Sequence, residues 1–219
     1  RVCPASKGKP CVHCKVCAIT SGLAGSGAFS DAKFNLGTAY GGTLGEELGD
    51  DVAMHYINRV DNILRYFSED YPEMYESNED LKLECLQNNL RLLDMNVRHL
   101  GTDRNVVTMQ NLIYWLETNN VEIRSLTTCS NIGRAQDAYI LHTTTTGDID
   151  EEIIAANKVI VATGRGGADF VKRLCNNFNI ESECNSVDIG VRVELPATVF
   201  AHITDELYES KIVYCTEKY

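Results

Sequence analysis

Residues 21–35 contain three glycines and three serines, and Lys33 stands near the end of this stretch. Glycine gives the backbone access to positive φ and allows close approach of a ligand, while lysine supplies a cation. A loop of this composition could therefore wrap around a phosphate-bearing ligand. An ordinary turn has a similar composition, so a small-residue turn without a ligand is the alternative interpretation.

A second stretch, residues 158–167, has the sequence KVIVATGRGG. Its β-branched run stops at a turn of small residues, which is typical of a buried strand that brings its backbone to a ligand at its carboxyl end. We therefore expect residues 157–163 to form a buried strand. An ordinary left-handed turn at residues 163–165 is the alternative.

The N-terminal region holds four cysteines with the spacing C-x7-C-x2-C-x2-C: Cys3, Cys11, Cys14 and Cys17. A C-x2-C step lets two thiolates reach one metal ion, which predicts a zinc site. The spacing of the four cysteines also resembles the runs of cysteine ligands that hold iron–sulfur clusters, so an iron–sulfur centre is the other predicted occupant. Redox use and plain reduced thiols are the alternatives. His13, inside the cluster, could be a fifth ligand, although a lone histidine beside cysteines is more often incidental. The other five cysteines lie in apolar segments, and most of them are expected to be buried and inert.

Four segments together resemble the FAD-dependent dehydrogenases of the glutathione-reductase-like flavoproteins, which carry two dinucleotide-binding folds. In chain order they are residues 25–33 (GSGAFSDAK), 99–102 (HLGT), 161–165 (VATGR) and 188–196 (DIGVRVELP). Their order and spacing are similar to the family's over nearly the whole chain. Two departures stand out, because the family usually has glycine where this chain has Ala24 and Ala32.

The resemblance implies FAD as the cofactor and assigns residues to its site. The residues implied to contact FAD are Gly25, Ser26, Gly27, Ala28, Phe29, Ser30, Lys33, Ala162, Thr163, Gly164 and Arg165. A cation such as Lys33 near the flavin would stabilise the reduced, anionic form. His99 and Arg192 are candidates for the substrate side, although a core histidine and a structural ion pair explain them equally well. No residue is assigned as catalytic acid or base.

The resemblance also predicts the domain organisation. Such flavoproteins begin with a strand–GxGxxG–helix unit, and no part of this sequence matches it, so we expect the chain to be the middle of a longer enzyme. The fold class is α/β (mixed α+β), as part of a glutathione-reductase-like FAD-binding fold. Residues 1–20 form a cysteine-rich segment, 21–185 the FAD-binding portion with a helical insertion at about 43–98, and 186–219 the start of a substrate domain.

Charge and hydropathy limit the kinds of partner that this chain is expected to bind. The net charge of −11 argues against nucleic acid and anionic membranes, and no apolar run reaches the roughly 18 residues of a membrane span. A cytoplasmic location is therefore predicted. A small-molecule substrate or an electron carrier is the expected partner, with a homodimer formed through any strand left unpaired.

Hydrophobic periodicity predicts the elements that position these segments. Helices are expected at residues 50–69, from near 77, at 103–118, 168–178 and 196–207, with Trp115 packing beside the third. Strands are expected at 121–126, 138–143, 157–163, 187–195 and 211–215. The leading functional hypothesis is a fragment of an FAD-dependent oxidoreductase that acts on an unknown organic substrate and is inactive alone. The competing hypothesis is a non-enzymatic metal-binding or scaffold module that uses the cysteine cluster.

Overall fold

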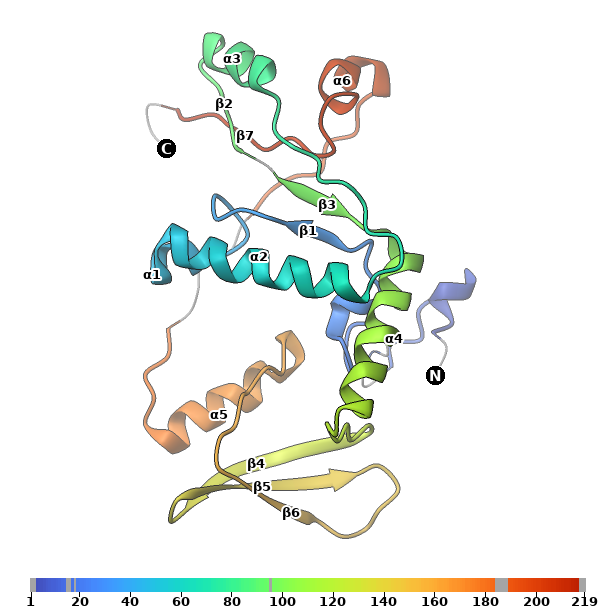
Figure 1. The fold of residues 1–219 in the computed structure, drawn as a ribbon, viewed down its shortest axis with the longest axis vertical. Helices are drawn as coiled ribbons and strands as arrows, with labels where there is room; N and C mark the ends of the chain where they lie inside the picture. The colour runs from blue at the N-terminus through green and yellow to red at the C-terminus, as the bar shows by residue number, and fades with distance from the viewer. Residues whose placement is uncertain (1–2, 15–16, 18, 95, 184–188, 217–219) are drawn as a thin grey trace. The chain divides into compact units, whose positions relative to one another are not determined.

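A computed structural model describes residues 3–14, 17, 19–94, 96–183 and 189–216, and the chain folds into two compact units (Figure 1). Unit 1 comprises Arg1–Ser26 and Glu117–Gly190, and unit 2 comprises Gly27–Leu116 and Val191–Tyr219. Both contain helices and small antiparallel sheets, which confirms the mixed class expected from the sequence.

Unit 1 is built on a three-stranded antiparallel sheet in the order β4-β5-β6, against which a helix packs. Its elements are η1 (Ala5–Lys7), β4 (Thr127–Ala135), β5 (Ala138–Thr145), β6 (Glu152–Ala156), η3 (Arg165–Gly167) and α5 (Ala168–Phe178). Ile132 of β4 and Leu174 of α5 are buried, and the rings of Tyr139 and Phe178 lie 6.3 Å apart. The helix predicted at 168–178 is thus confirmed, with Leu174 at its buried centre.

Unit 2 combines helices with two small antiparallel sheets, in which β1 pairs with β3 and β2 pairs with β7. Its elements are η2 (Gly25–Phe29, which begins in unit 1), β1 (Lys33–Asn35), α1 (Leu44–Leu48), α2 (Asp50–Phe67), α3 (Glu79–Gln87), β2 (Arg91–Leu92), β3 (Val97–His99), α4 (Thr102–Thr118, which ends in unit 1), α6 (Ala197–Thr204) and β7 (Ile212–Val213). Four helices expected from the sequence appear here as α2, α3, α4 and α6, and part of the expected strand 211–215 appears as β7.

The core of unit 2 lies beside the pairing of β1 with β3, along which α2 runs (Figure 1). Leu100, Val97 and Ala53 are almost completely buried. Arg98 and Asp61 form a buried ion pair, with Nε 3.0 Å from Oδ1, and the hydroxyl of Tyr71 donates to the same Oδ1 at 2.6 Å. A buried charge is stable only when it is paired in this way, so this cluster ties α2 to β3.

The three- and four-residue spacing of apolar residues along α2 predicts one buried stripe, and the structure shows this only in part. Ala53 and Leu64 are buried, but Tyr56, Val60 and Ile63 are each more than 40% exposed. The spacing of Leu83 and Leu86 predicts that they face inward on α3, but both are exposed, while Leu81 and Cys85 line a small cavity against α6. Asn78 caps this helix, with its Oδ1 accepting from the Leu81 amide at 3.0 Å.

The prediction of a strand at 121–126 was wrong, because pairing begins one residue later, at Thr127. Leu126 has a φ of 57°, and a left-handed residue breaks the extended path that a strand requires. The alternating pattern across 121–126 indicated extended backbone but carried no information about this break.

The prediction of a buried strand at 157–163 was also wrong. The pairing of β6 with β5 ends at Ala156 opposite Tyr139, so only Ala138 of β5 lies beyond this point and the seven residues 157–163 have no strand there to pair with. No other strand in the described part of the chain pairs with 157–163, and Ile160 is 93% exposed. A β-branched run indicates strand propensity, but a strand also needs a partner.

The strand expected at 187–195 is absent over 189–195, and residues 187–188 lie outside the described part. Ile189 and Val191 are about nine-tenths exposed, in keeping with a segment that has the alternation of a strand and no neighbour. Within the described residues, no helix is both long and apolar enough to cross a membrane.

Candidate cofactor-binding site

The small-residue loop is held in place by one side chain from α4. Residues 25–29 form the single turn η2, and Asn105 donates its amide to the carbonyl oxygens of Gly27 at 2.7 Å and Ala28 at 3.1 Å. Asn105 is only 2% exposed. Because a buried amide needs partners, these bonds fix the loop against the first turn of α4.

Backbone pairing then brings two of the four resembling segments together. Lys33 of β1 stands opposite His99 of β3, and the Leu100 amide donates to the Ala32 carbonyl at 3.0 Å. The Gly101 amide donates to the Asp31 carbonyl at 2.9 Å. Backbone hydrogen bonds therefore hold residues 27–33 beside residues 99–102 in unit 2, although the two segments are far apart in the sequence.

The two positions that depart from the family pattern have a special conformation. Ala24 has a φ of 61° and Ala32 a φ of 53°, both in the left-handed region that favours glycine. Ala32 is also 2% exposed, so its backbone is enclosed by the pairing just described. The structure thus places an unfavourable residue at the two points where glycine is usual in the resembled family.

Ser30 uses its hydroxyl within the loop. Its Oγ donates to the Gly27 carbonyl at 2.8 Å and accepts from the Ala32 amide at 3.1 Å. This hydroxyl therefore stabilises the turn and keeps one acceptor position for any further partner. Next to it, Phe29 is 53% exposed at the tip of η2.

A group of charged side chains surrounds the end of the loop. Lys33 forms an ion pair with Glu209, whose other oxygen lies 3.7 Å from Nζ of Lys211. The Lys211 ammonium lies 4.2 Å from the centre of the Tyr40 ring. Lys33 is therefore a partly buried, paired lysine rather than a solvated surface one.

His99 lies in a second part of this group. Its Nε2 is 3.8 Å from Oδ2 of Asp31, and its ring lies 4.7 Å from that of Tyr208. Tyr208 in turn lies 5.1 Å from Tyr75. Partial burial raises the pKa of the Tyr208 hydroxyl, and the Asp31 carboxylate adds to this rise. A histidine beside a carboxylate and a neutral phenol can hold or pass a proton, which suits a substrate-side group.

The residues present fit a phosphate-bearing flavin cofactor in two respects. A side chain added at Gly25 or Gly27 would meet no atom within 4 Å, so the backbone there is open to a ligand. Lys33 supplies a cation at the end of the same loop, where it pairs with Glu209. The open backbone would hold the cofactor and the lysine would balance its charge.

The turn after the expected strand belongs to unit 1. Gly164 has a φ of 63°, Ala162, Thr163 and Gly164 are exposed, and the Arg165 side chain lies outside the described part. A side chain added at Gly166 would lie 3.9 Å from Oγ of Ser21, at the start of the small-residue loop. That residues 25–33 and 162–166 share one cleft stays a prediction, since most of the loop belongs to unit 2.

Arg192, the other substrate-side candidate, is 88% exposed at its side chain, with Nε 3.5 Å from Oε1 of Glu194. An ion pair this exposed contributes little to stability. The structure does not bring Arg192 together with His99 in any described interaction, so its role stays a prediction.

The cysteines are not gathered into a ligand set. Cys11, Cys14 and Cys17 are exposed and Cys3 is half-buried, and the described residues contain no group of three or more His, Cys, Asp or Glu placed to hold a metal. Hydrogen bonds, first from the Thr20 side chain and then from nearby backbone, lower the pKa of the Cys17 thiol. A metal or iron–sulfur centre on Cys3, Cys11, Cys14 and Cys17 stays a prediction that requires the segment to rearrange.

The cysteines outside this cluster are less buried than expected. Cys85, Cys129 and Cys175 are half-buried, Cys215 is exposed, and Cys184 lies outside the described part. Burial raises the pKa of the Cys129 thiol, which keeps it protonated and unreactive.

Three residues of this site were missed in the sequence: Asn105, Tyr208 and Glu209. Asn105 follows the HLGT segment within one helical turn, and a polar residue on the buried side of a predicted helix was the available signal. Tyr208 and Glu209 carry no local signal, because the site residues that they contact, His99 and Lys33, lie more than 100 residues away in the chain.

No protein-family model, curated protein or solved structure matches this chain.

Proposed function

We propose that this chain is part of an FAD-dependent oxidoreductase and that residues 25–33, together with 99–102, form the flavin-side wall of its cofactor site. The observation that carries the proposal is the contact between these two segments through the pairing of β1 with β3 and through Asn105. Two segments of one cofactor site must be neighbours in space. Segments this far apart in the sequence need not be neighbours, so their contact supports the proposal.

The left-handed alanines support the same proposal. The backbone has a positive φ at residues 24 and 32, and these are the two positions at which the resembled family usually has glycine. The loop therefore keeps a glycine-like path although two of its glycines are replaced.

The roles of the residues follow from this placement. Gly25, Ser26, Gly27 and Ala28 would present backbone to the cofactor, and Lys33 would face its negative charge. Residues 162–165 would contact it from the end of their segment. His99, beside Asp31 and Tyr208, would exchange a proton with the substrate or hold its polar group. FAD, when bound, would supply the transfer of electrons to or from an organic substrate or an electron carrier.

We also propose the finer fold assignment, a middle segment of a glutathione-reductase-like protein. It is supported by the exposure of two apolar runs, 158–163 and 189–195, which have the composition of strands and lack partners in the described residues. Exposed runs of this kind usually pair with another strand. A neighbouring domain or a second copy, as a homodimer, would supply that strand.

The experiment is to purify the natural protein that contains this chain and record its visible spectrum. The proposal predicts a yellow protein with an absorption maximum at about 450 nm and FAD in the supernatant after heat denaturation. A colourless protein that contains zinc and takes up no added FAD would contradict the proposal and favour the metal-binding module instead.

A further inference from the structure

A groove of about 770 Å³ lies between α2 and α4 in unit 2, away from the loop described above. Small-molecule sites occupy roughly 300–1,000 Å³, so the groove is of a suitable size. Three aromatic side chains, Tyr66, Phe67 and Trp115, form part of its wall, and Ile63 and Leu112 add apolar surface. The ring centres of Phe67 and Trp115 are 5.8 Å apart, edge to face.

The charge in this groove has one sign. Arg59 is the charged residue that lines it, and within the described part of the chain no Asp or Glu side chain does. The guanidinium of Arg59, with no carboxylate beside it in the lining, favours an anionic occupant.

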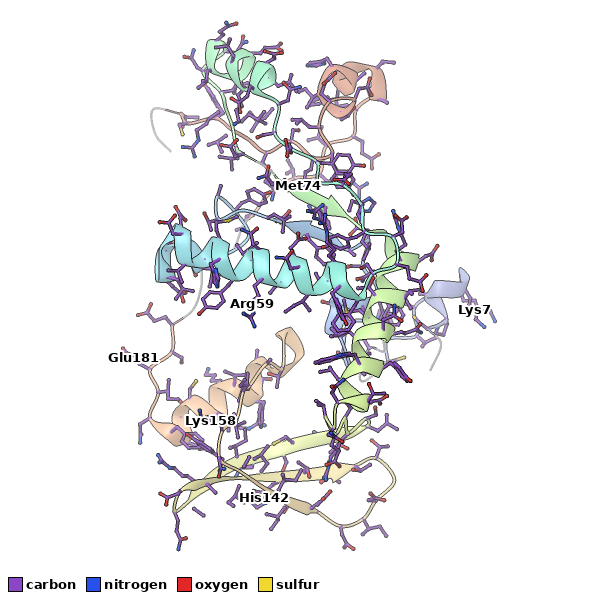
Figure 2. The ribbon with its side chains drawn as sticks, in the orientation of Figure 1. Lys7, Arg59, Met74, His142, Lys158 and Glu181 are labelled. Atoms are coloured by element: carbon purple, nitrogen blue, oxygen red, sulfur yellow. The ribbon has the colours of Figure 1, made fainter. Side chains whose placement is uncertain are left out.

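The charge of Arg59 is not neutralised by its own helix. The residues three and four positions away are His55, Tyr56, Asn62 and Ile63, none of them acidic. Among the described residues Arg59 forms no ion pair. Figure 2 shows its side chain projecting from α2 on the side away from β1. A guanidinium beside aromatic walls binds a carboxylate, sulfonate or phosphate with two hydrogen bonds.

We propose that this groove is a binding site for a small organic anion with a flat aromatic body, whose ring contacts Trp115 and Phe67 and whose anionic group binds Arg59. The site is separate from the proposed flavin site, because no residue of 25–33 lines the groove. Its ligand is therefore a second small molecule, such as an aromatic carboxylate or a phosphorylated aromatic compound.

The test uses two dyes of similar shape, anilinonaphthalene sulfonate, which is anionic, and N-phenylnaphthylamine, which is neutral. Trp115 is the only tryptophan of the sequence, so quenching of its fluorescence reports occupancy of the groove. The proposal predicts one anionic dye per chain with quenching of Trp115. The variant Arg59→Gln should bind it about tenfold more weakly, with the neutral dye unchanged.

The matched control is Arg65→Gln, which removes the same charge from the same helix at a residue that lies over Tyr71 rather than in the groove. This variant should bind the anionic dye as the unmodified protein does.

Equal weakening by both variants, binding of many dyes per chain, or binding without quenching of Trp115 would overturn the proposal. Loss of dye binding as the protein concentration rises would also overturn it, since a second copy would then fill the groove. FAD content, measured alongside, should not change in Arg59→Gln, so this result is independent of the flavin proposal.

Discussion

Asn105 donates its side-chain amide to the main-chain oxygen of Gly27 at 2.7 Å. Through this bond a residue in the first turns of α4 sets the position of a loop that precedes it by 78 residues. The loop carries few apolar contacts of its own, since Ala28 and Ala32 are its buried residues. Its conformation therefore depends on polar contacts with the HLGT segment and the helix that follows.

Replacing Asn105 by Ala should destabilise unit 2 and release the loop. The change removes two hydrogen bonds from a buried side chain, which corresponds to about 1–3 kcal/mol. Urea unfolding measures the loss, and hydrogen exchange at residues 27–29 should rise. Gln110→Ala, at an exposed position of the same helix, is the control and should leave both quantities unchanged. Equal exchange in the two variants would show that Asn105 does not hold the loop.

Replacing Ala32 by Gly should stabilise the protein. Relief of the left-handed conformation gains about 1–2 kcal/mol, and the greater freedom of glycine in the unfolded chain costs about 0.5–1 kcal/mol. A net gain of about 0.5–1 kcal/mol is expected in chemical denaturation. Ala28→Gly, in the same loop but without a positive φ, should lower stability instead. A loss of stability in both variants would argue against a strained Ala32.

The stability of the protein should fall at alkaline pH because of Tyr71. Burial raises the pKa of its hydroxyl well above the usual range, and the hydrogen bond to Asp61 adds to this. The folded state then keeps a proton that the unfolded chain loses at a pH of about 10. The contribution of Tyr71 is therefore fully present below that pH and is lost progressively above it. In Tyr71→Phe the free energy of unfolding should decline less steeply above this pH, while Tyr66→Phe, an exposed site, should follow the unmodified protein.

The helices could be predicted from the sequence because their signals are local. The three- and four-residue spacing along α2, α4 and α5 lies within each segment, and the helices appear near the predicted bounds. The strands predicted at 157–163 and 187–195 could not be judged in this way, since a strand exists only when another strand pairs with it. The sequence of 158–163 indicates extended backbone and carries no information about its partner.

The local segments of the candidate site could be predicted from the sequence, whereas the contacts between them could not. Its loop and the HLGT segment were identified by composition and by a resemblance, because glycine, serine and lysine are informative residues. The pairing of Lys33 with Glu209 was not predictable, since 176 positions separate them and neither belongs to a pattern. Asn105 was missed because a polar residue in a helix is usually exposed.

The most direct test of the flavin proposal is the FAD dissociation constant of Lys33→Ala in the natural protein that contains this chain. Loss of a charge-assisted contact is worth about 1.5–3 kcal/mol, so we predict FAD binding about 10- to 150-fold weaker. Glu209, left without its partner, would add repulsion. Lys211→Ala, which removes the second cation near Glu209, is the matched control and should bind FAD nearly as the unmodified protein does. An unchanged dissociation constant in Lys33→Ala would contradict the placement of FAD at this loop.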